Sequence, residues 1–97
     1  MFARLTTAET KIARIAKLVK IYEESVVPAA KKQKGYCGAY LLIDRKTGKG
    51  VSVTLWDCEG DALANEKNRY YQEQLVKFMN ILTKPPIREG YEVVFQD

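Results

Sequence analysis

The spacing of apolar residues alternates along this chain between the two-residue period of a strand and the 3.6-residue period of a helix. Taken in order, the segments predict strand, helix, strand, tight turn, strand, helix and strand. This order is typical of the ferredoxin-like βαββαβ fold, an α+β class in which two helices cover one face of a four-stranded antiparallel sheet. We expect residues 1–97 to form a single domain of this kind.

Helical spacing extends over two parts of the chain. Residues 10–27 predict one helix, and Pro28 is expected to end it because proline cannot continue the hydrogen-bond ladder. A short helix around residues 62–65 is expected before a longer one that Pro85 and Pro86 end. The predicted buried face of the first helix carries Ile12, Ile15, Ala16, Val19, Tyr22 and Val26, and that of the longer helix carries Tyr71, Leu75, Phe78, Met79 and Leu82.

Strands are expected at residues 1–5, 36–44, 49–56 and 91–96. Between the second and third, the run from Asp44 to Lys49 has the composition of a four-residue hairpin loop built on a type I turn, with Gly48 at positive φ. If Asp44 faces Lys49, the register pairs Leu42 with Val51, Leu41 with Ser52, Tyr40 with Val53 and Cys37 with Trp56.

Both faces of the predicted hairpin are apolar. One carries Tyr40, Leu42, Val51, Val53 and Leu55, and the other carries Ala39, Leu41, Ile43, Ser52, Thr54 and Trp56. Two helices can cover only one of these faces. We therefore expect the other to pack against the same face of a second copy, which gives an isologous homodimer.

Composition is that of a water-soluble globular domain, with 46% hydrophobic and 29% charged residues. No apolar run approaches the roughly 18 residues that span a bilayer, so a cytoplasmic protein without membrane partners is expected. The net charge of +4 is concentrated on and just after the first helix, where a solvated face explains it. Cys37 and Cys58 are too few for a zinc site and are expected to be free, buried thiols, so no metal is predicted.

Residues at the ends of these elements and in the turns between them resemble those of a known family. They lie at 26–30, 35–41, 48–50, 55–56 and 91–94, and include Pro28, Gly48 and Trp56. In them, and over essentially the whole chain, the sequence resembles the antibiotic biosynthesis monooxygenase (ABM) domain family of dimeric α+β barrels. The resemblance implies a dimeric α/β barrel in which two sheets face each other. It also implies a ligand cleft between sheet and helices in each subunit.

One branch of that family degrades haem. It uses an Asn on the first strand, a Trp on the short helix after the third strand and a His ligand on the following helix. At the corresponding places this chain has Ala3, Asn65 and Leu75, and it contains no histidine. A haem iron would need Tyr, Cys or Met as its ligand instead, so the sequence argues against haem degradation of the usual kind.

The resemblance to the cofactor-free branch implies a monooxygenase, an oxidoreductase that acts on an aromatic phenol or quinol. There a dry pocket and a few hydrogen-bond donors let the ionised substrate pass an electron directly to O2. No cofactor is expected, and no residue stands out as the general base. Candidates for contacting the substrate are Tyr22, Tyr40, Trp56, Asn65, Asn68, Tyr70, Tyr71 and Arg88.

Each of these candidates also has a structural interpretation. Tyr22 and Tyr71 occur at core spacing, Trp56 is suited to plug the end of its strand, and Asn68 can cap a helix. Two other functions use the same fold. RNA-recognition domains share the order of elements, but residues 49–56 place Val at both base-stacking positions, which argues against nucleic acid.

The second alternative is a non-catalytic homodimer that binds a small hydrophobic molecule or serves as an assembly module. It needs no general base. A cavity of roughly 300 Å³ or more between sheet and helices would favour a ligand site, and a filled cleft would favour a scaffold.

Overall fold

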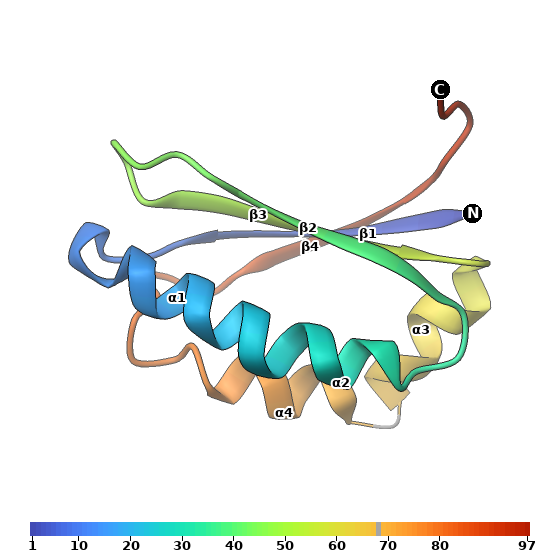
Figure 1. Cartoon of the computed structure of the whole chain (residues 1–97), viewed down its shortest axis with the longest axis horizontal. Coiled ribbons are helices and arrows are strands. Elements are labelled where there is room, and N and C mark those ends of the chain that lie inside the picture. The colour runs from blue at the N-terminus through green and yellow to red at the C-terminus, as the bar shows by residue number, and fades with distance from the viewer. Residues whose placement is uncertain (68) are drawn as a thin grey trace.

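The computed structural model of the protein describes residues 1–67 and 69–97. In this part of the chain, four antiparallel strands form a sheet in the order β2-β3-β1-β4, namely β1 (Phe2–Glu9), β2 (Tyr36–Ile43), β3 (Lys49–Trp56) and β4 (Ile87–Glu92). The helices all lie on one face of this sheet (Figure 1). The predicted ferredoxin-like α+β fold is therefore confirmed.

The first helical region does not end at Pro28. It runs through η1 (Ile12–Arg14), α1 (Ile15–Ile21), the π-helical turn η2 (Tyr22–Val26) and α2 (Val27–Lys31). Pro28 lies in the first turn of α2, directly after the π-helical turn. That wider turn contains Glu24, the residue whose carbonyl would clash with the Pro28 ring in a regular α-helix. The local change of helix type is what lets the chain continue.

The π-helical turn also changes which residues are buried. Ile15, Leu18, Tyr22, Val26 and Ala30 are buried. The last four are spaced by four residues, a step that a regular 3.6-residue helix cannot keep on one face but a wider turn can. The prediction was right for Ile15, Tyr22 and Val26. It missed Leu18, and it was wrong for Ala16 and for Ile12, which is 56% exposed.

The second helical region consists of α3 (Glu59–Lys67) and α4 (Tyr70–Val76), so the short helix is longer than predicted and the long one is shorter. After α4 the backbone bonds join residues three apart, as from Phe78 N to Leu75 O at 2.9 Å. Bonds of this type tighten the chain and rotate the following residues. Met79 is consequently 67% exposed, and its expected place on the buried face is wrong.

The hairpin between β2 and β3 has the predicted turn. Asp44 N donates to Lys49 O at 2.8 Å, Gly48 N donates to Asp44 O at 2.9 Å, and Gly48 has a φ of +82°. The pairs Leu42–Val51, Leu41–Ser52 and Tyr40–Val53 are confirmed.

The predicted pairing of Cys37 with Trp56 is wrong. An irregularity between Tyr36 and Gly38 inserts one residue, so that Tyr36 faces Trp56. Cys37 and Cys58 are free, as expected, but both are exposed rather than buried.

The outer strands differ from the prediction at their ends. β1 continues to Glu9, and β4 occupies residues 87–92 instead of 91–96. β4 pairs only with β1, from Thr7–Ile87 to Phe2–Glu92. Its ladder therefore ends opposite Phe2, where β1 begins, since a strand needs a partner for its backbone groups. Val94 and Phe95 lie beyond it, 85% and 81% exposed, on a tail that leaves the sheet on the face opposite the helices (Figure 1).

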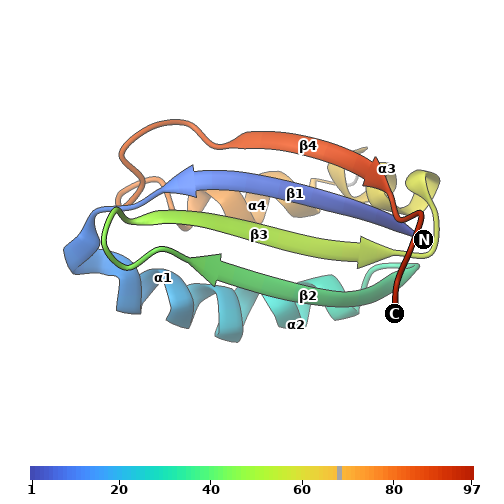
Figure 2. The same ribbon diagram turned by 90° about the horizontal axis from the view of Figure 1, so that it is seen from above.

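The two sheet faces differ in what covers them. On the helix side, Phe2, Trp56 and Ala62 form a buried core cluster, and Trp56 is 1% exposed. The other face is open to view in Figure 2, with the helices behind the sheet. Large apolar residues on it remain exposed, namely Tyr40 at 60%, Leu42 at 54%, Ile87 at 62% and Tyr91 at 50%. Within the described ranges, no helix combines the length and apolar character that crossing a membrane requires.

Candidate functional site

A cavity of about 120 Å³ lies between the sheet and the helices. Because side chains alternate along a strand, the inner residues of β1 and β3, together with Arg88 of β4, form its floor, and α1, η2 and α4 form its roof. Most of the lining is apolar, with three tyrosines and two arginines among it. Floor residues are Arg4, Thr6, Ser52, Thr54 and Arg88, and roof residues are Leu18, Tyr22, Val26, Tyr70, Tyr71 and Leu75.

The volume limits what this cavity can hold. Sites for drug-sized ligands usually measure about 300–1,000 Å³. An apolar cavity of about 150 Å³ is enough for benzene. At about 120 Å³ the cavity is smaller than both, so it is not filled, is too small for a polycyclic ligand, and has room for at most a single aromatic ring.

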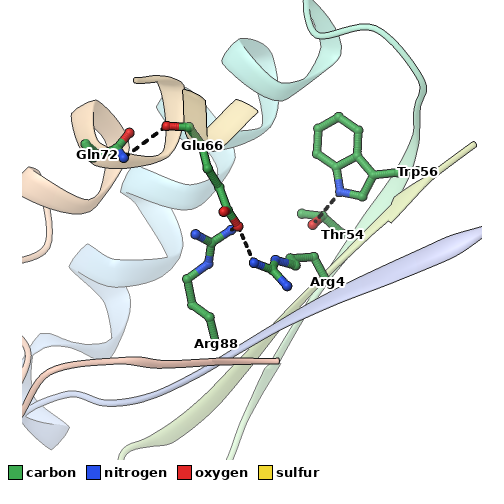
Figure 3. A network of polar contacts seen from close by, with 6 residues as sticks. All are labelled: Arg4, Thr54, Trp56, Glu66, Gln72 and Arg88. Carbon is green, nitrogen blue, oxygen red and sulfur yellow. Dashed lines mark hydrogen bonds and ion pairs between the residues drawn. The ribbon is translucent and has the colours of Figure 1, made fainter. Parts of the chain in front are cut away.

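One end of the cavity carries an ion-pair cluster of Arg4, Glu66 and Arg88. Glu66 Oε1 contacts Nη2 of both arginines, and its distance to Arg88 Nη2 is 2.8 Å. The sheet register brings the arginines together, because Arg88 faces Thr6 and is a diagonal neighbour of Arg4. Glu66 reaches them from the last turn of α3, as Figure 3 shows.

The cluster holds two cations and one anion in partly dry surroundings. The side chains of Arg4 and Arg88 are 18% exposed and that of Glu66 is 26% exposed. Burial lowers the pKa of Arg88, the nearby Arg4 adds to this, and Tyr71 and Glu66 oppose it. Both Nε–H groups are buried, and neither has a hydrogen-bond partner among the described residues. Unpaired buried donors cost free energy, so Glu66 alone does not satisfy this cluster.

The tyrosines supply hydroxyl groups and ring faces. Tyr22 Oη and Ser52 Oγ are 2.8 Å apart, and Tyr70 Oη donates to Val26 O at 3.3 Å. Burial raises the pKa of Tyr22 and raises that of Tyr70 to about 12. Both hydroxyls therefore stay protonated at neutral pH, where they can form hydrogen bonds but do not act as bases.

Five of the eight predicted site residues line the cavity, namely Tyr22, Trp56, Tyr70, Tyr71 and Arg88. Trp56 is mainly a packing residue: its Nε1 donates to Thr54 Oγ1 at 3.0 Å, and its ring meets Tyr36 edge-on at 6.0 Å between centroids. Tyr40 lies on the opposite face of the sheet and is not brought to the cavity. Asn68 and the side chain of Asn65 lie outside the described part of the protein.

Arg4 and Glu66 are the site residues that sequence reasoning missed. Arg4 had a detectable signal, because it is a charged residue on the strand face that also carries Phe2 and that the helices cover. Glu66 had none, since it lies at the expected break between two helices. Ala3, the position compared with the haem-branch Asn, does not line the cavity, whereas Arg4, Thr6 and Ala8 of β1 do.

No family model and no curated protein matches this sequence. Solved structures do match its fold over nearly the whole chain. A candidate antibiotic biosynthesis monooxygenase from Bordetella bronchiseptica has a TM-score of 0.82 and 14% sequence identity, with 97% of each chain covered. A protein of unknown function from Nitrosomonas europaea has a TM-score of 0.77 and 20% identity, with 99% of this chain and 91% of that one covered.

The haem degrader MhuD from Mycobacterium tuberculosis, solved with two haems in its active site, has a TM-score of 0.79 and 16% identity over 100% of this chain and 99% of its own. At identities this low, the structural matches establish a shared fold and nothing further. Haem does not fit the present site, because a cavity with room for one ring is smaller than a porphyrin. Its described lining contains no His, Cys or Met, so tyrosine is the one residue type there that could ligate a haem iron.

Proposed function

We propose that this chain is an ABM-type protein whose cavity binds a single-ring phenol or quinol and lets it react with O2 without a cofactor. The observation that supports this most directly is the combination of tyrosine-lined walls with two guanidinium groups at one end. The sequence resemblance to the ABM family and the shared fold point the same way.

Ionisation of the substrate is the step that the arginines would assist. A phenolate oxygen next to Arg4 and Arg88 is stabilised by positive charge in a partly dry site, which lowers the pKa of the bound phenol. The proton can then leave to solvent, and no protein base is required. The bound phenolate transfers one electron to O2, and the resulting radicals combine to a peroxide anion on the ring, which takes up a proton from solvent to give a hydroperoxide. Loss of water leaves a quinone, so that a phenol and one O2 give one quinone and one water.

Oxygen uptake tests this proposal. The protein is incubated with hydroquinone and with simple phenols at neutral pH, and uptake is compared with the rate in buffer alone. We expect a rate above buffer, incorporation of one oxygen atom from labelled O2, and at least about a tenfold loss in Arg88→Gln, since a hydrogen bond to a charged group is typically worth more than 1.4 kcal/mol. Arg14→Gln, which changes an exposed arginine of η1, is the matched control and should keep the rate.

The alternative is a non-catalytic binding module. One observation favours it: Glu66, the carboxylate at the cavity end, is engaged by two guanidinium groups and is not free to act as a base, and a binding module needs none. If hydroquinone binds, is recovered unchanged in air and consumes no oxygen above buffer, the monooxygenase proposal is wrong and the binding module replaces it.

We further infer that the open sheet face packs against a second copy, giving a dimeric barrel. The apolar residues exposed on that face include Tyr40, Leu42 and Ile87, and contiguous apolar surface of this kind marks interaction sites. A sheet with helices on one side needs cover on the other, and an identical apolar sheet supplies it. The exposed Val94 and Phe95 leave β4 on the same side and can extend the contact.

A further inference from the structure

The charge balance at the cavity end points to the kind of ligand it takes. Arg4 and Arg88 together carry two positive charges, and Glu66 supplies one negative charge. The three side chains are between 18% and 26% exposed, so water screens this excess positive charge only in part. A ligand with one negative charge would neutralise this excess and would be bound more favourably than a neutral one.

The hydrogen-bond donors lead to the same conclusion. Glu66 engages each guanidinium through Nη2, and Oε1 is the oxygen used in both contacts. The Nε–H groups of Arg4 and Arg88 have no hydrogen-bond partner among the described residues, which exclude residue 68 and the side chain of Asn65. Guanidinium groups bind carboxylates best through two parallel hydrogen bonds, an arrangement that the single shared oxygen of Glu66 does not provide. A second carboxylate would give these donors acceptors once the guanidinium groups turn toward it.

The shape of the site fixes where that carboxylate belongs. The Tyr71 ring lies against the guanidinium of Arg88, with 3.5 Å between the guanidinium carbon and the ring centroid. The stacked pair restricts Arg88 and makes the cationic end continuous with the aromatic wall. A ring in the cavity would therefore have its carboxylate and the phenol oxygen ortho to it at the arginines, and the rest of its surface against apolar side chains.

We propose that the Arg4–Arg88 end of the cavity recognises the carboxylate of a single-ring aromatic acid. This inference rests on the proposed function, because it names the substrate class of the same cavity: a quinol or phenol that also bears a carboxylate. It adds a selectivity that a binding site for neutral phenols would not have.

A set of three probes tests the selectivity. Gentisate is hydroquinone with one added carboxylate, and gentisamide is its neutral amide of nearly the same shape. Dissociation constants for gentisate, gentisamide and hydroquinone are measured by calorimetry at neutral pH and constant salt. We expect gentisate to bind at least about tenfold more tightly than gentisamide, the size of effect typical of a hydrogen bond to a charged partner.

Variants assign the preference to the arginines. Arg4→Gln and Arg88→Gln should each remove most of the gentisate preference, whereas Arg14→Gln should keep it. Glu66→Gln separates recognition from simple structural support. It removes the competing carboxylate, so the preference for gentisate over gentisamide should rise, whereas a mere loss of pocket structure would lower the affinity for both. Thermal unfolding of every variant checks that it is folded.

The outcomes separate this inference from the proposed function. If hydroquinone and gentisamide bind as tightly as gentisate, the carboxylate inference is overturned and the cavity remains a phenol site. A fall in preference in folded Glu66→Gln overturns it as well. If gentisate binds with the expected preference but no quinol is oxidised, carboxylate recognition stands and the oxygenase proposal falls.

Discussion

The guanidinium carbon of Arg88 lies 3.5 Å from the centre of the Tyr71 ring, so a cation on strand β4 rests on an aromatic face of helix α4. The same arginine contacts Glu66 near the end of α3. Arg88 thus joins the outer strand of the sheet to both helices of the second helical region. The cavity end depends on this one side chain for its charge and also for its shape.

Replacing the Tyr71 ring should cost stability. We expect Tyr71→Leu to lower the free energy of unfolding by about 1–2 kcal/mol, because a partly desolvated cation–π contact and aromatic packing are lost. Tyr71→Phe keeps the ring face and should cost less than half as much. Urea unfolding followed by circular dichroism measures both. Equal losses in the two variants would show that the hydroxyl, not the stacked ring, stabilises this contact.

Tyr70 should make the protein sensitive to alkaline pH. Burial raises its pKa from 10.0 to about 12 in the folded protein. Because the unfolded chain releases this proton at lower pH, the contribution of Tyr70 is complete below pH 10 and is lost as the pH rises through about 12. We expect Tyr70→Phe to show a shallower fall in the free energy of unfolding than the unmodified protein over that window. Urea unfolding at a series of pH values tests this, and identical slopes would contradict it.

Gly48 should not tolerate a side chain. Its φ is +82°, and a Cβ built on it would meet the carbonyl oxygen of Thr10, a backbone atom that cannot easily move. Gly48→Ala is expected to lower the free energy of unfolding by more than about 1 kcal/mol, since the left-handed conformation alone costs that much.

Gly60 is the matched control for this substitution. It lies in helix α3, where an added Cβ makes ordinary contact with Cys58 Sγ at 3.8 Å. Gly60→Ala should be neutral or should stabilise by up to about 1 kcal/mol. The urea denaturation midpoints of both variants measure the difference in stability. A stable Gly48→Ala would contradict the close approach of Thr10 to the hairpin.

The proposed dimer should dissociate when charge is placed on the open sheet face. We expect Leu42→Lys to shift the protein from dimer to monomer in sedimentation experiments at micromolar concentration, because buried unpaired charge opposes association. Val76→Lys puts the same charge on α4, where Val76 is 63% exposed, and should leave the dimer intact. A protein of 11.1 kDa that sediments as a monomer before any substitution would refute the proposal.

The hairpin was predicted correctly from the sequence, whereas the helix that Pro28 was expected to end was not. Hydrophobic alternation identified the hairpin, its turn at Gly48 and most of its register, because neighbouring strands and tight turns follow local rules. The sequence-based prediction failed at Pro28, where a π-helical turn continues the helix, and at β4, whose C-terminal end at Glu92 lies opposite the first residue of β1. The end of β4 depends on non-local pairing, whereas the helix continues past Pro28 through a local change of helix type.

In the candidate site, too, some residues were predicted from the sequence and others were not. Aromatic residues at core spacing, Tyr22 and Tyr71, were found from the sequence because a helical face is visible in a short stretch of it. Tyr40 was assigned wrongly to the cavity, since alternation places it on a face without saying which face the helices cover.

What the sequence by itself determined is the order of elements, the β-hairpin and the presence of two apolar sheet faces, all consequences of periodicity within short segments. Only the tertiary structure brought Arg4, Glu66 and Arg88 together, because these residues lie 62 and 22 positions apart in the chain and meet through the pairing of β1 with β4 and the packing of α3. An ion-pair cluster of this kind has no local signature. Its charge, its buried donors and the ligand it favours become visible once the chain is folded.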